Sequence, residues 1–202
     1  MTSLRLRPTM LSDLDWVVSV ERDAANLPFI TPWERTQHEG AIRFPDSRHF
    51  VLEGWSPSPA GTPSIPQGEA ATLGSGPTGG PGDALERIGF VILQGCRNPN
   101  GSVELKRLVL QAKGRGLGRA AVRQLKAMAF TQLKAHRFWL DVKALNTRAL
   151  KLYQGEGFVE EGRLRESVRV TTQGADGYDS LVVMSLLDRE YQARVALGQE
   201  GA

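Results

Sequence analysis

The stretch Ser102-Val-Glu-Leu-Lys-Arg-Leu-Val-Leu-Gln-Ala-Lys-Gly-Arg-Gly-Leu-Gly-Arg119 decides the fold of this chain. An alternating strand over 102–110 runs into Gly114, Gly116 and Gly118, and an amphipathic helix follows at once. The start of a helix presents unpaired backbone N–H groups and the positive end of the helix dipole. Glycine lets the backbone take positive φ or approach a ligand closely. The sequence therefore predicts a phosphate-binding corner.

One interpretation of this corner is a dinucleotide site. Gly116-Leu-Gly118-Arg-Ala-Ala121 fits the loose dinucleotide pattern, and Asp141 follows Gly118 by 23 residues, where a ribose-binding acid is expected. Against it, Glu104, Lys106 and Arg107 lie in the preceding strand, which in a dinucleotide domain is buried on both faces. A dinucleotide-binding oxidoreductase stays open as an alternative, and NAD(H) binding would decide for it.

The segment after Asp141 favours a different family. It contains the spacing N-x-x-A-x-x-L-Y-x-x-x-G-F, carried by Asn146, Ala149, Leu152, Tyr153, Gly157 and Phe158. The glycine loop, Lys113-Gly-Arg-Gly116-Leu-Gly118, is close to the form [QR]-x-x-G-x-[GA], with Lys in the first position. Together these motifs resemble the GNAT acetyltransferase superfamily, and within it the branch that acetylates ribosomal proteins and polyamines. The resemblance covers residues 87–191 well and 1–55 loosely.

This resemblance implies an α/β fold with a mixed, mostly antiparallel sheet of about seven strands flanked by helices. The sheet would be splayed between the strands 102–110 and 137–143, within a single domain over residues 1–191, followed by a tail over 192–202. Of the 31 residues 56–86, 20 are Gly, Pro, Ser or Thr. Such a segment cannot bury enough apolar surface to offset its ordering entropy, so we expect a flexible insertion between two neighbouring strands.

Other elements follow from periodicity and end signals. Strands are expected over 4–7, 49–53, 87–93, 137–142, 158–169 and 178–187. Helices are expected from Ser12, as N-cap, to Arg22, over 34–44, from Leu117 onward, and from Asn146. In the helix after the glycine loop, Arg119, Arg123 and Lys126 fall opposite the apolar stripe.

The resemblance also implies where acetyl-CoA, as co-substrate, would bind. Its pantetheine arm would pair with backbone groups of Leu108, Val109 and Leu110 like an extra strand. Its phosphates would meet the corner that comprises Lys113, Gly114, Arg115, Gly116, Leu117, Gly118 and Arg119. Asn146 is an expected helix N-cap that would also contact the cofactor.

Two residues are candidate catalytic groups through the same resemblance. Tyr153 matches the general acid that protonates the departing CoA thiolate, and the alternative is a core tyrosine with a bonded hydroxyl. Glu104 occupies the strand position of a general base in several members. Its alternative is an exposed carboxylate that pairs with Lys106 or Arg107.

The expected activity is transfer of acetyl from acetyl-CoA to a primary amine by direct attack. A lysine-like amine with pKa about 10.4 is neutral in only about 0.04% of molecules at pH 7, so a base matters most for such acceptors. The acceptor, which could be a polyamine, a protein N-terminus or a small amine, should be contacted by residues 12–45. A non-catalytic acyl-CoA sensor is the alternative from another class.

Composition narrows the remaining possibilities. The net charge of +3 in 202 residues is too small and dispersed to indicate nucleic acid. A single cysteine, Cys96, fits a reducing cytosol, and no metal-ligand spacing occurs among three histidines and this cysteine. No apolar run long enough for a membrane span or signal peptide appears. We therefore expect a cytoplasmic protein without metal or membrane partner, and leave a homodimer open.

Overall fold

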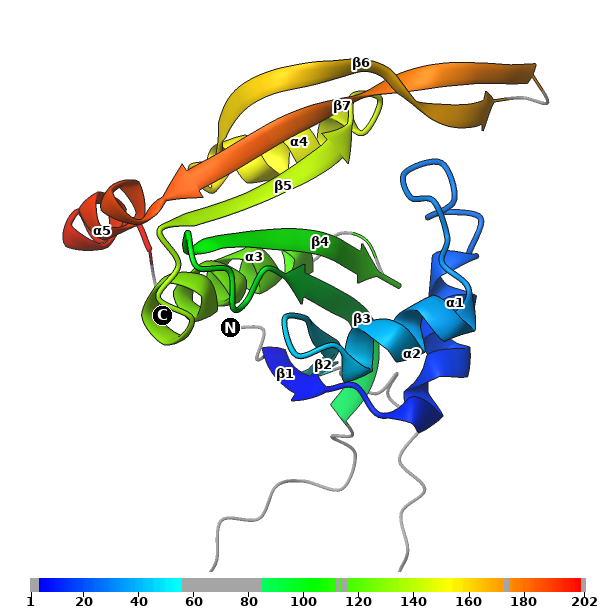
Figure 1. The fold of residues 1–202 in the computed structure, drawn as a ribbon, viewed down its shortest axis with the longest axis horizontal. Coiled ribbons are helices and arrows are strands. Elements are labelled where there is room, and N and C mark those ends of the chain that lie inside the picture. Colours follow the sequence, from blue (N-terminus) through cyan, green and yellow to red (C-terminus); the bar gives the residue numbers. More distant parts are fainter. Residues whose placement is uncertain (1–3, 56–84, 112, 114–115, 173–174, 201–202) are drawn as a thin grey trace, which may run out of the picture.

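The computed structural model describes residues 4–55, 85–111, 113, 116–172 and 175–200 (Figure 1). Its strands are β1 (Leu4–Pro8), β2 (Arg48–Trp55), β3 (Leu85–Gln94), β4 (Ser102–Leu110), β5 (Arg137–Lys143), β6 (Val159–Thr172) and β7 (Ala175–Leu187). Its helices are η1 (Leu11–Asp13), α1 (Leu14–Glu21), α2 (Arg35–Arg43), α3 (Leu117–Ala127), the π-helical turn η2 (Met128–Gln132), α4 (Thr147–Gly155) and α5 (Asp188–Ala196).

The strands form one seven-stranded sheet in the order β1-β2-β3-β4-β5-β7-β6. Neighbours are antiparallel except β4 and β5, which run parallel. This mixed, mostly antiparallel sheet confirms the predicted fold class. It does not fit a dinucleotide domain, whose sheet is mostly parallel.

The two halves of the sheet separate between β4 and β5. Their register runs only from Ser102↔Arg137 to Glu104↔Trp139, and beyond Glu104 the two strands diverge (Figure 1). The edge of β4 that faces β5 therefore lacks a ladder partner over residues 105–110. This is the predicted splay.

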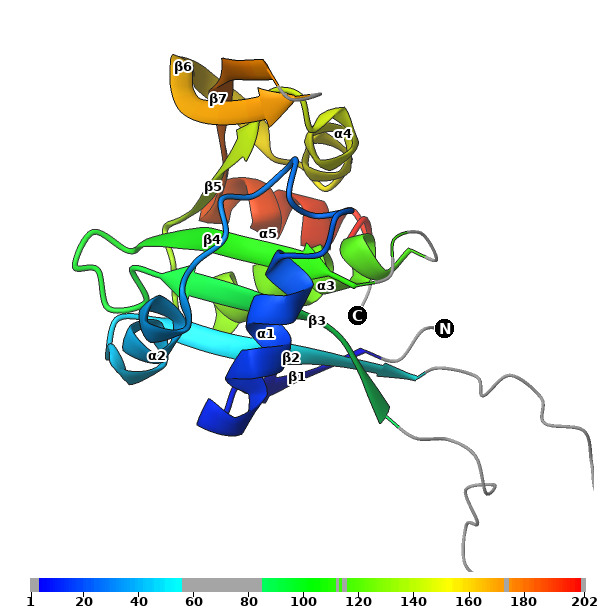
Figure 2. The ribbon, with the colours of Figure 1, turned by 90° about the vertical axis from the view of Figure 1, so that its right-hand side faces the viewer.

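Helices cover the two faces of the sheet (Figure 2). Val17 and Val20 of α1 pack on Phe90, Ile92 and Val109 on one face. On the opposite face, Ala121, Val122 and Leu125 of α3 join the larger core cluster, together with the strand residues Val91 and Leu93. Leu117 of the same helix is also buried. Alternation along β3 thus sends successive side chains into two separate cores.

A bulge in β4 changes which face its side chains occupy. Arg107 pairs with Ile92 while Leu105 pairs with Leu93, so Lys106 is an extra residue in β4. Bulges re-aim neighbouring side chains. As a result Leu105 joins the core on the α3 side, whereas Arg107 reaches Glu21 of α1 on the other face.

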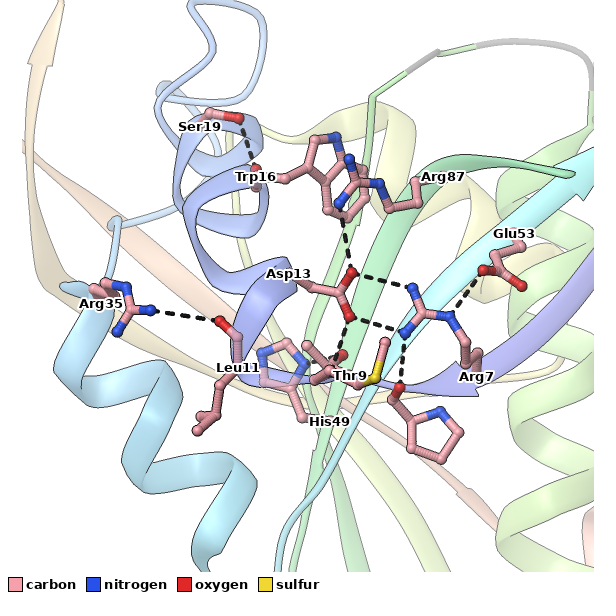
Figure 3. Close-up of polar contacts among 12 residues, drawn as sticks. Arg7, Thr9, Leu11, Asp13, Trp16, Ser19, Arg35, His49, Glu53 and Arg87 are labelled. Atoms are coloured by element: carbon pink, nitrogen blue, oxygen red, sulfur yellow. Dashed lines mark hydrogen bonds and ion pairs between the residues drawn. The ribbon is translucent and has the colours of Figure 1, made fainter.

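Ionic contacts fasten the start of α1 to three strands (Figure 3). The buried Asp13 carboxylate accepts hydrogen bonds from Arg7 of β1, at 2.8 Å and 3.1 Å, and from the Met10 backbone N–H. Arg87 of β3 approaches it at 3.4 Å, and Arg7 also binds Glu53 of β2 at 2.8 Å. The expected N-cap at Ser12 is wrong, because Ser12 lies inside η1 and the Asp13 side chain ties back to the preceding turn.

Several predicted boundaries shift. β3 begins at Leu85, which pairs with Trp55, so residues 85 and 86 belong to the sheet rather than to the insertion. Residues 56–84 lie outside the described part of the chain. Helix α5 includes residues 192–196, which were expected in the tail.

The structure contradicts the predicted position of Lys126. It was placed on the polar face of α3, yet its side chain is fully buried. Its Nζ donates to a Glu156 carboxylate oxygen at 3.0 Å and to Glu200 at 2.6 Å. A buried lysine is tolerated because acidic partners surround it.

Candidate active site

The splay between β4 and β5 opens into two adjoining cavities. The first, of about 570 Å³, lies between the end of β4, the start of α3 and α4. The second, of about 330 Å³, lies between β4, β5 and the β6–β7 hairpin. Both are lined by Phe29, Ile30, Leu108, Asn146, Ala149 and Tyr153. One elongated site therefore passes through the opening, within the range typical of ligand sites.

The glycine corner forms one wall of the first cavity. Gly116 has φ +72° and is the N-cap of α3, with no side-chain cap on the following N–H groups. A Cβ on Gly118 would lie 3.2 Å from Leu152 of α4, so glycine permits close helix packing there. A helix start without a side-chain cap is the arrangement that the predicted anion corner at Gly116, Leu117 and Gly118 would use. Gly114 and Arg115 lie outside the described residues.

The charged side chains in the described lining of the first cavity are all cationic. Its described lining includes four cationic side chains and no carboxylate; the cations are Lys113, Arg119, Arg148 and Lys151. Sequence reasoning missed Arg148 and Lys151. The available signal was their spacing of three on the helix that begins at Asn146, which places them on one face.

Polar and aromatic contacts connect this corner with the segment between α1 and α2. Lys113 donates to the Ala25 carbonyl oxygen, and its Nζ lies 5.3 Å from the Phe29 ring centroid. Partial burial lowers the pKa of Lys113. The predicted strand residues Leu108, Val109 and Leu110 also line the first cavity, beside the unpaired edge of β4.

Asn146 and Tyr153 lie where the two cavities meet. The Asn146 side chain accepts a hydrogen bond from Ala149 N–H at 3.1 Å, which confirms the predicted helix cap. Tyr153 is 8% exposed, and its ring packs edge-on against Phe158 at 5.6 Å. Among the described residues, no hydrogen bond of its hydroxyl is found. Burial, and secondly the Asp141 carboxylate, raise the Tyr153 pKa, so the phenol stays protonated at neutral pH.

The second cavity has a different charge pattern. Lys106, Arg107 and Lys143 line it, together with a single carboxylate among the described lining, Asp141. Sequence reasoning considered Asp141 only as a ribose partner and missed this position. Glu104 lines neither cavity among the described lining and instead pairs with Lys106 at 3.1 Å.

A chain of buried polar groups leads from Arg107 away from the cavity. Arg107 Nη1 lies 2.9 Å from Glu21 Oε1, and Glu21 Oε2 lies 3.3 Å from His38 Nε2. His38 Nδ1 lies 3.2 Å from His49 Nε2, and His49 Nδ1 lies 2.8 Å from the Thr9 hydroxyl, a contact drawn in Figure 3. Burial lowers the His49 pKa to about 3, so this ring is neutral at physiological pH.

The expected acceptor region supplies part of the second cavity. Four of its lining residues come from the segment between α1 and α2: Phe29, Ile30, Thr31 and Trp33. The described residues contain no group of three His, Cys, Asp or Glu side chains that could hold a metal. No helix in the described part is both long and apolar enough to cross a membrane.

A splayed mixed sheet with a cationic, glycine-rich helix start beside a bipartite cavity defines a class of proteins that bind a phosphate-bearing carrier molecule and a second ligand. Residues 3–159 match the family model described as an acetyltransferase (GNAT) domain. The chain belongs to the GNAT acetyltransferase family, whose members take acetyl from acetyl-CoA.

Known relatives agree with this family. The chain is 30% identical over 108 residues to the spermidine N(1)-acetyltransferase of Vibrio cholerae serotype O1. This match spans 53% of the chain and 60% of the relative.

Solved structures show the same fold. The spermidine N-acetyltransferase of Vibrio cholerae in complex with CoA and spermine gives a TM-score of 0.70 at 23% identity, over 94% of this chain and 98% of that one. A dodecameric structure of spermidine N-acetyltransferase from Vibrio cholerae gives 0.66 at 24% identity, over 95% and 97%.

Proposed function

We propose that the protein is an N-acetyltransferase that moves the acetyl group of acetyl-CoA to a primary amine by direct attack. The observation that carries this proposal is the pair of adjoining cavities. One has a cationic wall and the other contains a carboxylate, and Tyr153 lies where they join.

The first cavity fits the phosphates of CoA. Backbone N–H groups at the start of α3, with Lys113 and Arg119 beside them, would bind the pyrophosphate. Arg148 and Lys151 of α4 offer further cations to a third phosphate. The unpaired edge of β4 at Leu108–Leu110 would hydrogen-bond the pantetheine arm. When bound, acetyl-CoA supplies an activated acyl group.

Two side chains would handle the protons. As the amine nitrogen bonds to the acyl carbon, the carbon–sulfur bond breaks, and Tyr153 would give its proton to the departing thiolate. Its raised pKa keeps that proton available. Asp141 would hold the incoming ammonium and take up its proton, because it is the carboxylate of the second cavity. Glu104 stays a second candidate base.

The test measures acetyl-CoA-dependent thiol release with a panel of amines, in the wild type and in Tyr153→Phe. Phenylalanine keeps the ring, so stability and acetyl-CoA affinity should change little. We expect kcat to fall about 10²-fold because the proton donor is lost. Tyr191→Phe is the matched control, since Tyr191 is equally buried but stacks on Phe130 away from both cavities.

Two outcomes would contradict parts of this proposal. A normal kcat in Tyr153→Phe at saturating acetyl-CoA removes the acid role and leaves acetyl transfer intact. Tight acetyl-CoA binding without thiol release for any amine would favour the non-catalytic sensor. Because the relative in Vibrio cholerae is a spermidine acetyltransferase, the panel includes spermidine.

A further inference from the structure

We propose that the acceptor of this enzyme carries a carboxylate on the same molecule as its amine, and that Arg107 binds this carboxylate. The inference rests on the proposed acetyl transfer and names its substrate class. It departs from the polyamine that the Vibrio cholerae relative acetylates.

The charged side chains of the second cavity are the first argument for this class of acceptor. Three cations, Lys106, Arg107 and Lys143, face one carboxylate, Asp141, in its described lining. Lys106 pairs with Glu104, Arg107 pairs with Glu21, and Asp179 acts electrostatically on Lys143, but none of these three carboxylates lines the cavity. A polyamine is cationic along its whole length, and the described lining offers it one carboxylate beside three cations. An acceptor that carries both an ammonium and a carboxylate can pair with Asp141 and with these cations.

The Arg107 side chain has the burial and the contacts of a ligand-binding group. Its side chain is 9% exposed, and its guanidinium carbon lies 4.6 Å from the Trp33 ring centroid. Both of its described polar contacts use Nη1, which meets Glu21 and the Thr31 carbonyl oxygen, each at 2.9 Å. Nε is buried and has no hydrogen-bond partner among the described residues. Buried polar donors normally have partners, so this one awaits an acceptor from outside the chain.

The guanidinium is held rigidly enough to select a ligand. Glu21 is fully buried and receives the Trp33 backbone N–H at 2.7 Å, while His38 lies against its other side. Arginine presents a planar fork that binds carboxylate through two parallel hydrogen bonds. With Nη1 occupied, Nη2 and Nε are the donors left for such a ligand, and the side chain has to turn to present Nε, which the protein covers in this structure.

The cavity orients the two ends of the acceptor. Arg107, Asp141 and Tyr153 all line the second cavity, and Asp141 acts electrostatically on both of the other side chains. An amine held at Asp141 and a carboxylate held at Arg107 would therefore lie in the same cavity as Tyr153. Lys143, whose Nζ donates to the Pro28 carbonyl oxygen at 3.2 Å, adds a second cation to that wall.

The experiment compares matched acceptors: 5-aminopentanoate against pentylamine, free amino acids against their amides, and the peptide Asp-Gly-Gly amide against Asn-Gly-Gly amide, with spermidine. We expect kcat/KM to be about 10- to 100-fold higher for the carboxylate member of at least one pair. Preference within the small-molecule pairs identifies a free amino acid, and preference within the peptide pair identifies an acidic peptide. Spermidine as the best acceptor, or equal rates within every pair, would overturn the proposal.

Variants test the role of Arg107. Arg107→Met with Glu21→Gln removes the buried pair together, so no charge is left uncompensated. Arg107→Lys keeps the charge opposite Glu21 but loses the fork. In both, the ratio of kcat/KM within the preferred pair should fall toward one. Arg163→Met, an exposed arginine paired with Glu160 on β6, is the control and should keep the ratio. An unchanged ratio in the folded Arg107 variants would refute the assignment.

These experiments distinguish the carboxylate subsite at Arg107 from the proposed acetyl transfer. Thiol release with any amine supports acetyl transfer whatever the preference within pairs. If no amine is acetylated, calorimetric titration of each pair into the acetyl-CoA-loaded protein tests the subsite by itself. Tighter binding of the carboxylate member of a pair, together with loss of this preference in Arg107→Lys, would then support the carboxylate subsite. Equal binding of the two members of every pair would refute it.

Discussion

Asp141 and Glu104 offer a direct comparison of two carboxylates at the scale of single residues. Asp141 lines the second cavity, whereas Glu104 is absent from its described lining and pairs with Lys106. We expect Asp141→Asn to lower kcat/KM about 10²-fold for an alkyl amine, because an ammonium must lose a proton before it attacks. The loss should be smaller for an α-amine, which is neutral more often. The measurement is steady-state kinetics with both acceptor types.

Glu104→Gln is the matched variant for this prediction. Its kcat/KM should stay near the wild-type value for both amines. If Glu104→Gln were the damaging change and Asp141→Asn the harmless one, the base would be Glu104, as the family resemblance alone implies.

His49 gives a stability prediction at the same scale. In the folded protein its pKa is lowered to about 3, whereas the unfolded side chain has a pKa of about 6.5. Above pH 6.5 the ring is neutral in both states and contributes no pH dependence. Between pH 6.5 and 3 the unfolded state binds the extra proton, so the free energy of unfolding falls by about 1.4 kcal/mol per pH unit through this group.

Urea unfolding of wild type and His49→Asn at several pH values measures this effect. The variant is less stable at pH 7 because it loses packing, but its stability should fall less steeply between pH 6 and pH 4. Parallel pH curves for the two proteins would show that the buried ring takes up a proton in the native state.

The glycine corner belongs to the scale of elements, because it joins β4 to α3. Gly116→Val forces a β-branched residue to φ +72°, and its side chain would stand in open space beside the first cavity. We expect acetyl-CoA affinity to fall at least about 10-fold while the protein still folds, at a strain cost of about 1–3 kcal/mol. Calorimetric titration and circular dichroism report the two quantities.

Gly177→Val in β7 serves as the control for this change. An added Cβ there also meets open space, but the backbone has no positive φ, and the residue lines neither described cavity. Its acetyl-CoA affinity should match the wild type. Equal affinity in Gly116→Val would remove the phosphate role from this corner.

At the same scale, α3 and α4 are joined by a buried carboxylate. Glu156, 1% exposed, receives Arg119 and Arg123 at 3.1 Å and Lys126 at 3.0 Å. Arg119 and α4 also line the first cavity. The two helices that supply three of its four described cations are thus fixed to each other by one ion-pair network.

For the whole molecule, the chain between β2 and β3 can be shortened. Trp55 and Leu85 are paired neighbours in the sheet, so a short connection can span them. Replacing residues 56–84 by a short Gly/Ser linker should leave acetyl-CoA affinity unchanged. The melting temperature should stay equal or rise slightly, because a shorter loop lowers closure entropy by about 1 kcal/mol. A large drop in melting temperature would contradict the expectation that this Gly- and Pro-rich segment adds nothing to the core.

The sequence by itself determined the glycine corner, and its motifs implied the fold class through their resemblance to the GNAT family. Alternation over 102–110, the glycines and the N-x-x-A-x-x-L-Y spacing are local patterns, and local geometry follows from local residues. Asn146 as a helix cap was predictable for this reason, whereas the place of Leu108–Leu110 beside the opening was implied by the family resemblance. The start of α1 was not, since Asp13 rather than Ser12 organises that turn through Arg7 and Arg87, which come from distant strands.

Only the tertiary structure decided which charges meet. Lys126 has the spacing of a surface residue, but Glu156 and Glu200 fold over it from positions far along the chain. Strict alternation would place Arg107 on the apolar face of Val103 and Leu105, but the bulge at Lys106 turns it to the other face, toward Glu21. Asp141 becomes a cavity carboxylate because β5 diverges from β4. Register shifts and long-range ion pairs depend on the packing of the whole sheet, which no short window of sequence contains.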